Sequence, residues 1–209
     1  MFKDRKDAGE KLAKVLEGYK LRNPLVLAIP RGGVEVGIQI AKFLNLEFSV
    51  IIVRKLPLPD NPEAGFGAVA EDGSEFIVPH AAGWVENSAK EEIKKEQEKE
   101  IQRRIKILRE GKPLPSIENR DVILVDDGIA MGSTVRASIK LCKSKGVRKL
   151  IVASPVAGPE VAEQIKGEVD EAVILEKPTF FRAVAQSYQN WYDVSDQEAI
   201  EAIKQFKAS

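Results

Sequence analysis

Short apolar runs alternate with stretches of helical periodicity along this chain, and that alternation restricts the fold more than any other feature of the sequence. The run at 25–29 is followed by apolar residues at helical spacing over 34–44, and then by a second apolar run at 48–53. Such a unit of strand, helix and strand places its two strands parallel in one sheet. Further apolar runs follow at 122–125, 149–153 and 172–175, with helical patterns at 134–144 and around 160–166. About five parallel strands predict an α/β fold with an open, mainly parallel twisted sheet flanked by helices.

The segments outside this alternation have patterns of their own. Apolar residues at helical spacing predict an amphipathic helix ahead of the first strand: Ala8, Leu12, Val15 and Leu16. Residues 56–65 contain three prolines and predict a long loop, of a kind that is often functional. Asp72-Gly73 predicts a β-hairpin. Residues 88–110 predict a strongly charged helix with a narrow apolar stripe, which either lies solvated on the domain or pairs with a second copy of the chain in a homo-oligomer.

The size of the chain fits one main unit with a small appendage. Its 209 residues are too few for two full-sized domains. We expect a core over 1–176, which includes the hairpin and charged helix at 66–110. A C-terminal lobe is expected over 177–209, where aromatic residues are frequent.

The charge balance and the apolar runs exclude several classes of partner. Lys and Arg total 32 and Asp and Glu total 32, so no overall field favours nucleic acid or an anionic membrane surface. No apolar run approaches membrane-spanning length, and the charged N-terminal segment lacks the apolar stretch of a signal peptide. The single cysteine, Cys142, cannot form an internal disulfide. We therefore expect a cytoplasmic protein whose anionic ligands are held by local geometry.

The segment after the run at 122–125 carries the chemistry. Asp126 and Asp127 follow a buried-type strand, at the sheet edge where open sheets bind ligands. Gly128 and Gly132 permit a tight turn, and the helix after it offers free N–H groups to an anion. Two adjacent carboxylates need a cation or several donors to stay ionised, which a vicinal diol with Mg2+ supplies. A phosphorylated sugar fits both halves of the turn, whereas the alternative is an ordinary turn in which one of the acids caps the helix.

Residues 122–134 resemble the signature of type I phosphoribosyltransferases. The resemblance implies that 5-phosphoribosyl 1-pyrophosphate binds here with Mg2+, and that Asp126 and Asp127 serve as metal-binding and catalytic residues. It also implies a substrate-binding turn made of Gly128, Ile129, Ala130, Met131, Gly132, Ser133 and Thr134. Two positions depart from the family pattern. Gly128 stands where an aliphatic residue is usual, and Met131 stands where a small or hydroxylated residue is usual, so one contact to the 5-phosphate is expected to be missing.

The resemblance extends to other segments in the same chain order. Arg31, Gly32 and Gly33 are similar to the pyrophosphate loop of the family, and Arg54 and Lys55 to its basic pyrophosphate contacts, which implies a catalytic role for these two. Residues 56–67 correspond to the flexible loop that closes over the site. Residues 177–209 correspond to the lobe called the hood.

The acceptor is restricted by one residue of the turn. In 6-oxopurine transferases of the family an Asp stands where this chain has Ala130, so the resemblance implies a small-molecule acceptor with a ring nitrogen, such as a nucleobase, other than hypoxanthine or guanine. Tyr188 and Trp191 are candidates for an aromatic cover over that ring. His80, the only histidine, has no neighbouring base or metal-ligand pattern and is left outside the site.

The expected reaction is displacement of pyrophosphate from the anomeric carbon, through an oxocarbenium-like state. The alternative is a non-catalytic sensor that binds the same donor or a nucleotide, for which a nucleic-acid-binding face is not evident. An ATPase is disfavoured because 128–134 lacks the lysine of a P-loop. Dinucleotide binding is disfavoured because Gly32, Gly33 and Gly37 do not have the required spacing.

Overall fold

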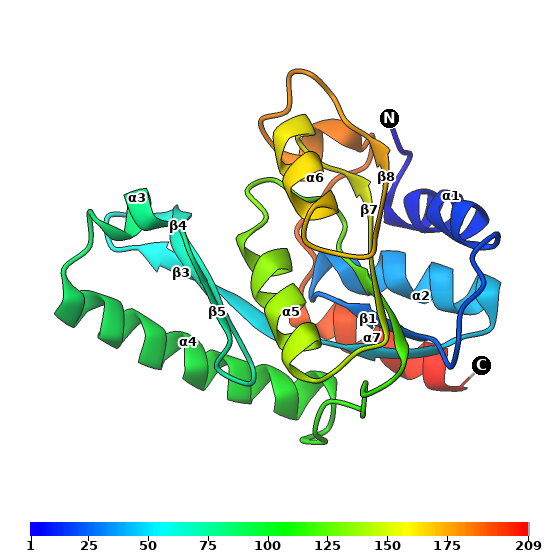
Figure 1. The fold of residues 1–209 in the computed structure, drawn as a ribbon, viewed down its shortest axis with the longest axis horizontal. Coiled ribbons are helices and arrows are strands. Elements are labelled where there is room, and N and C mark those ends of the chain that lie inside the picture. Colours follow the sequence, from blue (N-terminus) through cyan, green and yellow to red (C-terminus); the bar gives the residue numbers. More distant parts are fainter. Residues whose placement is uncertain (209) are drawn as a thin grey trace.

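The main sheet of the computed structural model, which describes residues 1–208, has five parallel strands (Figure 1). Its order is β2-β1-β6-β7-β8, with bounds β1 Leu25–Ala28, β2 Glu47–Val50, β6 Asp121–Val125, β7 Lys149–Val156 and β8 Glu171–Glu176. All four neighbouring pairs are parallel. The predicted open parallel sheet is therefore confirmed. The segment 48–53 is not one strand, because the chain leaves the sheet after Val50.

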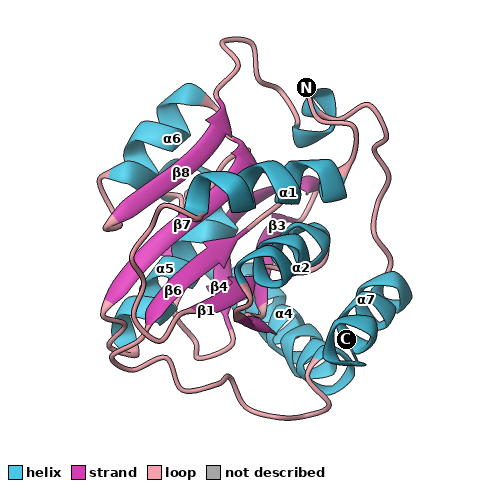
Figure 2. Ribbon diagram, turned by 90° about the vertical axis from the view of Figure 1, so that its right-hand side faces the viewer, coloured by secondary structure: helices cyan, strands magenta, loops and turns pink. Residues whose placement is uncertain are grey.

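Helices cover both faces of this sheet (Figure 2). They are α1 Arg5–Leu16 and α2 Gly32–Leu44 on one face, and α5 Ser133–Ser144 and α6 Pro159–Lys166 on the other. Alternate residues of the strands point to opposite faces. Thus Val122 and Leu124 are buried with α5 residues, whereas Ile123 is buried with residues of α1 and α2. In α1 the predicted apolar face is right except for Val15, which is 48% exposed.

A smaller antiparallel sheet stands beside the main one. It contains β3 Val53–Leu58, β4 Asn61–Ala70 and β5 Glu75–Ile77, in the order β3-β4-β5. The hairpin predicted at Asp72-Gly73 is confirmed, because it joins β4 to β5. The long loop predicted at 56–65 is wrong: β3 and β4 form a hairpin there with a turn at residues 59–60.

The prolines of this hairpin misled the sequence interpretation for a physical reason. Proline lacks a ladder donor and is excluded from central strands, but edge strands and irregular registers tolerate it. Here β3 is an edge strand, and the pairing shifts register on both sides of Pro57. Arg54 and Lys55 consequently lie within β3 rather than at the end of a strand.

The charged helix confirms the expectation of a narrow apolar stripe. This helix, α4 Asn87–Leu108, follows the short α3 Pro79–Ala82 and packs on β3 and β4. Ile101 and Leu108 are buried, and Ile93 and Ile105 are packed against the same cluster. The charged side of α4 is largely exposed. Within residues 1–208 no helix is long and apolar enough to cross a membrane.

The C-terminal segment has two parts in different places. Residues 177–195 include the short 3-10 helix η1 Val184–Ser187 and lie beside the N-terminus, where Phe2 pairs with Tyr188 (Figure 1). The final helix, α7 Asp196–Ala208, packs instead against α2 and α4. The first part of the C-terminal segment therefore lies against the N-terminal residues, and the second part lies against α2 and α4.

Candidate active site

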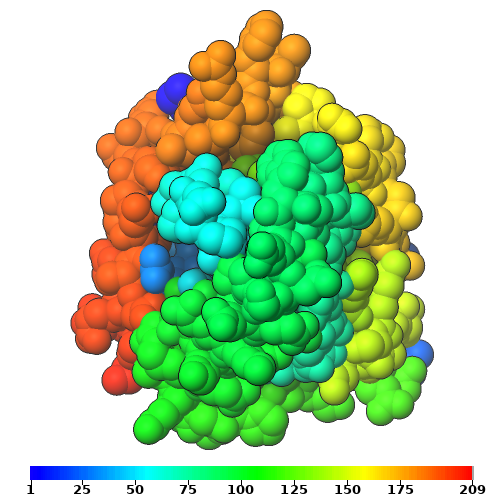
Figure 3. All heavy atoms as spheres, turned by 90° about the vertical axis from the view of Figure 1, so that its left-hand side faces the viewer, coloured from blue at the N-terminus to red at the C-terminus, as the bar shows by residue number. Residues whose placement is uncertain are grey.

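The turn after β6 lines a pocket with the β3–β4 hairpin. This nest pocket has a volume of about 250 Å³ and is lined by Asp126, Gly128, Ile129, Ala130, Met131, Gly132, Ser133 and Thr134, and by Lys55, Glu63, Gly65 and Gly67 of the hairpin. Figure 3 looks at the hairpin side of the molecule, where cyan atoms of the hairpin and orange atoms of the C-terminal segment flank a hollow. The blue atoms in the floor of that hollow belong to the N-terminal part of the chain, which does not line the nest pocket. The structure thus joins a strand-end turn to a hairpin far away in the sequence.

The turn is shaped to bind an anion. Gly132 has φ 76°, a left-handed conformation that favours glycine. Helix α5 begins at Ser133, so its free N–H groups face the turn. Met131 is 61% exposed and Ile129 is buried, paired with Ala157. Ile129 therefore anchors the turn: its N–H donates to the carbonyl of Val156 at 2.9 Å, and its carbonyl accepts from the N–H of Gly158 at 3.4 Å.

The two acids are unequal in their surroundings. Burial and the neighbouring charge of Asp127 hold the pKa of Asp126 well above its usual range. Burial also raises the pKa of Asp127, but the Arg5 guanidinium opposes that shift. The amide of Asp127 donates a hydrogen bond of 2.9 Å to Asp126 Oδ1. Asp126 lines the nest pocket, so a cation bound there would favour its ionised form.

The acidic pair suits a Mg2+ ion whose other ligands come from a substrate. Among residues 1–208 no group of three or more His, Cys, Asp or Glu could enclose a metal. Mg2+ is commonly held by one or two carboxylates together with water and substrate phosphates. Asp126 and Asp127 fit that chemistry as adjacent carboxylates, and Asp126 lines the nest pocket.

Arg5 is the site residue that the sequence interpretation missed. Its Nε donates to Asp127 Oδ2 at 2.7 Å, and its Nη1 donates to the carbonyl of Tyr192 at 3.0 Å. The guanidinium lies 4.1 Å from the centre of the Trp191 ring, and the residue is 3% exposed. In the sequence Arg5 is one of several charges in a charged N-terminal segment, and nothing marks it as buried.

The turn after β1 lies directly against the acidic pair. β1 and β6 are neighbours with Ala28 opposite Val125. A Cβ placed on Gly32 would lie 1.8 Å from Asp127 Oδ2, and one on Gly33 would lie 2.8 Å from the carbonyl of Val125. Both positions require glycine because the two turns touch. The structure therefore brings the predicted pyrophosphate loop and the predicted acidic pair together.

Two of the three basic residues in the prediction lie on opposite sides of the hairpin strand β3. Lys55 lines the nest pocket and donates to the carbonyl of Glu63 at 2.7 Å. Arg54 projects from the other face of β3, where its Nε donates to Gln97 of α4 at 3.0 Å. Burial, and then the positive charges of Arg104 and Arg31, lower the pKa of Arg54. Arg54 and Lys55 therefore do not act on the same side of β3.

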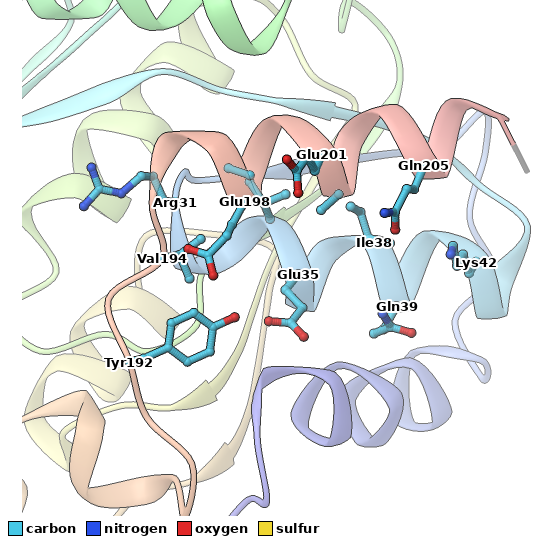
Figure 4. A pocket seen from close by; sticks show the side chains of 13 residues that line it. Arg31, Glu35, Ile38, Gln39, Lys42, Tyr192, Val194, Glu198, Glu201 and Gln205 are labelled. Carbon is cyan, nitrogen blue, oxygen red and sulfur yellow. The ribbon is translucent and has the colours of Figure 1, made fainter.

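A second groove begins at Arg31 and runs between α2 and α7 (Figure 4). It measures about 280 Å³, and Glu35, Glu198 and Glu201 contribute to its lining. Burial raises the pKa of Glu35, as expected of a carboxyl short of compensating charge. Arg31 and Lys42 line the groove as well, so its charges are mixed and only slightly acidic on balance. The nest pocket, where a helix N-terminus and Lys55 meet, is the better candidate for a sugar phosphate.

The aromatic candidates of the C-terminal segment are already engaged. Tyr188 donates its hydroxyl to the carbonyl of Asp127 at 2.6 Å, and Trp191 covers Arg5. These rings hold the site together rather than presenting a free face. His80, which the sequence interpretation left outside the site, lies in α3. Its ring packs against the ring of Trp84 in the following turn, with the ring centres 4.6 Å apart.

Comparison with known proteins identifies the family. A family model described as phosphoribosyl transferase domain matches residues 3–189, which is most of the chain. The chain belongs to the phosphoribosyl transferase domain family. The family match spans β1, β6 and both of the turns described above.

Relatives of this phosphoribosyl transferase domain are found in bacteria. MT0597 and Rv0571c of two Mycobacterium tuberculosis strains, whose names assign them provisionally as phosphoribosyl transferases, are 35% identical over 202 residues. The match covers 96% of this chain but 46% of each relative, so the chain spans less than half their length.

Solved structures share the fold. The crystal structure of TT1426 from Thermus thermophilus is 36% identical, covers 98% of both chains and has a TM-score of 0.81. AQ2163 from Aquifex aeolicus has a TM-score of 0.51 at 12% identity, covering 82% of this chain and 72% of its own. The latter supports the fold alone.

Proposed function

We propose that this phosphoribosyl transferase domain binds 5-phosphoribosyl 1-pyrophosphate with Mg2+ and transfers the phosphoribosyl group to a ring nitrogen, releasing pyrophosphate. The observation that supports this most is the meeting of three features in one place. The anion nest, the acidic pair and the glycine turn at Gly32 converge where β1 and β6 end. A phosphorylated sugar with a pyrophosphate group offers a matching partner to each of them.

The donor is proposed to lie across the two turns. The 5-phosphate takes the nest of residues 128–134, with Lys55 as the nearby cation. The ribose hydroxyls face Asp126. The pyrophosphate extends toward Arg31, Gly32 and Gly33, with Arg54 on that side of β3. Bound Mg2+ supplies positive charge beside the leaving pyrophosphate.

The proposed reaction exchanges one bond at the anomeric carbon for another. The lone pair of the acceptor nitrogen forms the new bond to that carbon, the carbon–oxygen bond to pyrophosphate breaks, and its electron pair leaves with pyrophosphate. The proton that the acceptor ring loses passes to solvent. Carboxylates next to the ribose stabilise the positive charge that develops on it. Ala130 offers no acid or base to a purine ring, so we propose a nucleobase acceptor other than a 6-oxopurine.

Calorimetry and a turnover assay test the two parts of this proposal. We expect heat of binding and a raised melting temperature with millimolar donor and Mg2+, since a ligand of the folded state alone stabilises it. We expect pyrophosphate release with one member of a panel of nucleobases. Donor binding without release across the panel would favour a sensor, and no binding at all would exclude both functions.

A further inference from the structure

Gly128 is crowded by a side chain from the C-terminal segment. A Cβ placed on Gly128 would lie 2.3 Å from Cγ1 and 2.7 Å from Cγ2 of Val184. Such distances are far inside van der Waals contact, so one of the two residues would have to move. The φ of Gly128 is not among the positive values of this chain, so its backbone accepts other residues. The three atoms nearest to such a Cβ all belong to Val184, so the packing of Val184 favours glycine here.

Val184 therefore places an aliphatic side chain next to position 128. The resemblance to the family leads one to expect such a side chain at position 128 itself. Residue 184 begins η1, and the same segment contacts the turn again a few residues later. Tyr188 donates to the carbonyl of Asp127, and Trp191 covers the guanidinium of Arg5 that pairs with the Asp127 carboxylate. The segment thus contacts both Asp127 and Gly128.

A turn that carries two adjacent carboxylates has to be held in place from outside. Asp126 and Asp127 are adjacent in the chain, and two carboxylates this close repel each other when both are ionised. Val184 and Tyr188 of the C-terminal segment contact the turn. Gly32 and Arg5 contact the carboxylate of Asp127.

We propose that Val184 is a positioning residue, which supplies from the C-terminal segment the aliphatic side chain that is absent at Gly128 and thereby fixes the acidic turn in its donor-binding conformation. The part of this inference that concerns the donor rests on the proposed function. The packing part does not, because it concerns only the contact between residues 184 and 128.

An exchange of the two side chains tests the inference. The variants are Gly128→Val, Val184→Gly and the double variant, each made with Trp84→Phe so that Trp191 is the only tryptophan left of two. Affinity for the donor with Mg2+ is measured by calorimetry, and Trp191 emission reports whether the segment still lies on Arg5. We expect each single variant to weaken donor binding by about tenfold or more and to shift the Trp191 emission. The donor affinity of the double variant should recover to within about threefold of the parent's.

Val194→Gly is the matched control. Val194 is a buried valine of the same segment, 8% exposed, that packs in a different cluster from the turn. Its loss should lower the melting temperature while leaving donor affinity and Trp191 emission near those of the parent.

Three results would overturn the inference. They are a Val184→Gly variant that binds the donor like the parent, a double variant no better than Gly128→Val, and a Val194→Gly variant with the same loss of affinity. If the parent itself binds no donor, the proposed function fails. The Trp191 emission and the melting temperatures of the parent and the three exchange variants then still decide whether residues 184 and 128 are coupled.

Discussion

At the scale of single residues, the site depends on atoms that approach closely at two turns. Gly32 has no room for a side chain because the carboxylate of Asp127 occupies that space. Asp127 in turn is paired with Arg5, a side chain that is almost fully buried. The identities of these residues follow from contacts between segments that are far apart in the sequence.

Gly32→Ala is expected to damage the site more than the fold. The new methyl group would stand 1.8 Å from Asp127 Oδ2, so the carboxylate must turn away. We expect donor affinity to fall by about tenfold or more and stability to fall by about 1–3 kcal/mol. Gly18→Ala is the control, because nothing lies within 4 Å of that position. Equal donor affinity in Gly32→Ala and the parent would contradict the placement of the donor.

Arg5→Met tests the buried ion pair. Removing one partner leaves the Asp127 carboxylate buried without its cation, at a cost of about 3–5 kcal/mol near pH 7. Burial already raises the pKa of Asp127, and Arg5 is the main group that opposes this shift, so the variant raises the pKa further. A carboxyl group whose pKa is higher in the folded than in the unfolded protein stabilises the folded state at pH values below its unfolded-state pKa. This contribution to stability is lost as the pH rises through the folded-state pKa.

The stability deficit of Arg5→Met should therefore shrink between pH 7 and about pH 4. Urea unfolding at several pH values measures it. Lys11→Met, which removes an exposed i,i+4 partner of Asp7, should cost only about 0.5 kcal/mol. A deficit in Arg5→Met that grows with acidity would show that Asp127 is not the affected group.

At the scale of elements, the β3–β4 hairpin decides which basic side chain reaches which part of the site. The alternation of β3 places Lys55 in the nest pocket and Arg54 against Gln97 of α4. The sequence interpretation treated the two residues together as pyrophosphate contacts. An irregular loop at 56–65 would not impose this division, but a strand does.

Two fragments of the donor can separate the roles of Arg54 and Lys55. We expect Lys55→Met to weaken the binding of ribose 5-phosphate by about tenfold and the binding of inorganic pyrophosphate by less than about threefold. Arg54→Met should weaken pyrophosphate binding more than ribose 5-phosphate binding. Calorimetry in the presence of Mg2+ measures all four affinities. Equal losses for both fragments in each variant would mean that the two side chains share one ligand group.

At the scale of the whole molecule, the core consists of large apolar clusters. One cluster lies on each face of the main sheet, and a third lies around the small sheet. Cys142 lies in the first of these clusters, with no exposed surface. Burial raises the pKa of its thiol to about 12. The thiol is thus both inaccessible and protonated in the folded protein.

The reactivity of Cys142 should report global unfolding. At pH 8 we expect alkylation in native buffer to be slower than in urea by a factor on the order of the folding equilibrium constant. Stability should also decline above pH 9, because the thiol ionises in the unfolded chain before it does so in the folded one. Donor and Mg2+ should slow alkylation further. Fast labelling of the native protein would show local opening of α5.

Much of this protein was determined by local sequence. The parallel sheet, the charged helix and the turn with Asp126 and Gly132 are all predictable, because strand and helix periodicity and glycine-rich turns act over a few residues. Only the tertiary structure decided the hairpin at 56–65, the opposite directions of Arg54 and Lys55, and the roles of Arg5 and Val184. Edge position makes Pro57 acceptable in a strand, and burial against Asp127 distinguishes Arg5 from its charged neighbours. These properties depend on which distant segments meet in space, and local periodicity carries no record of that.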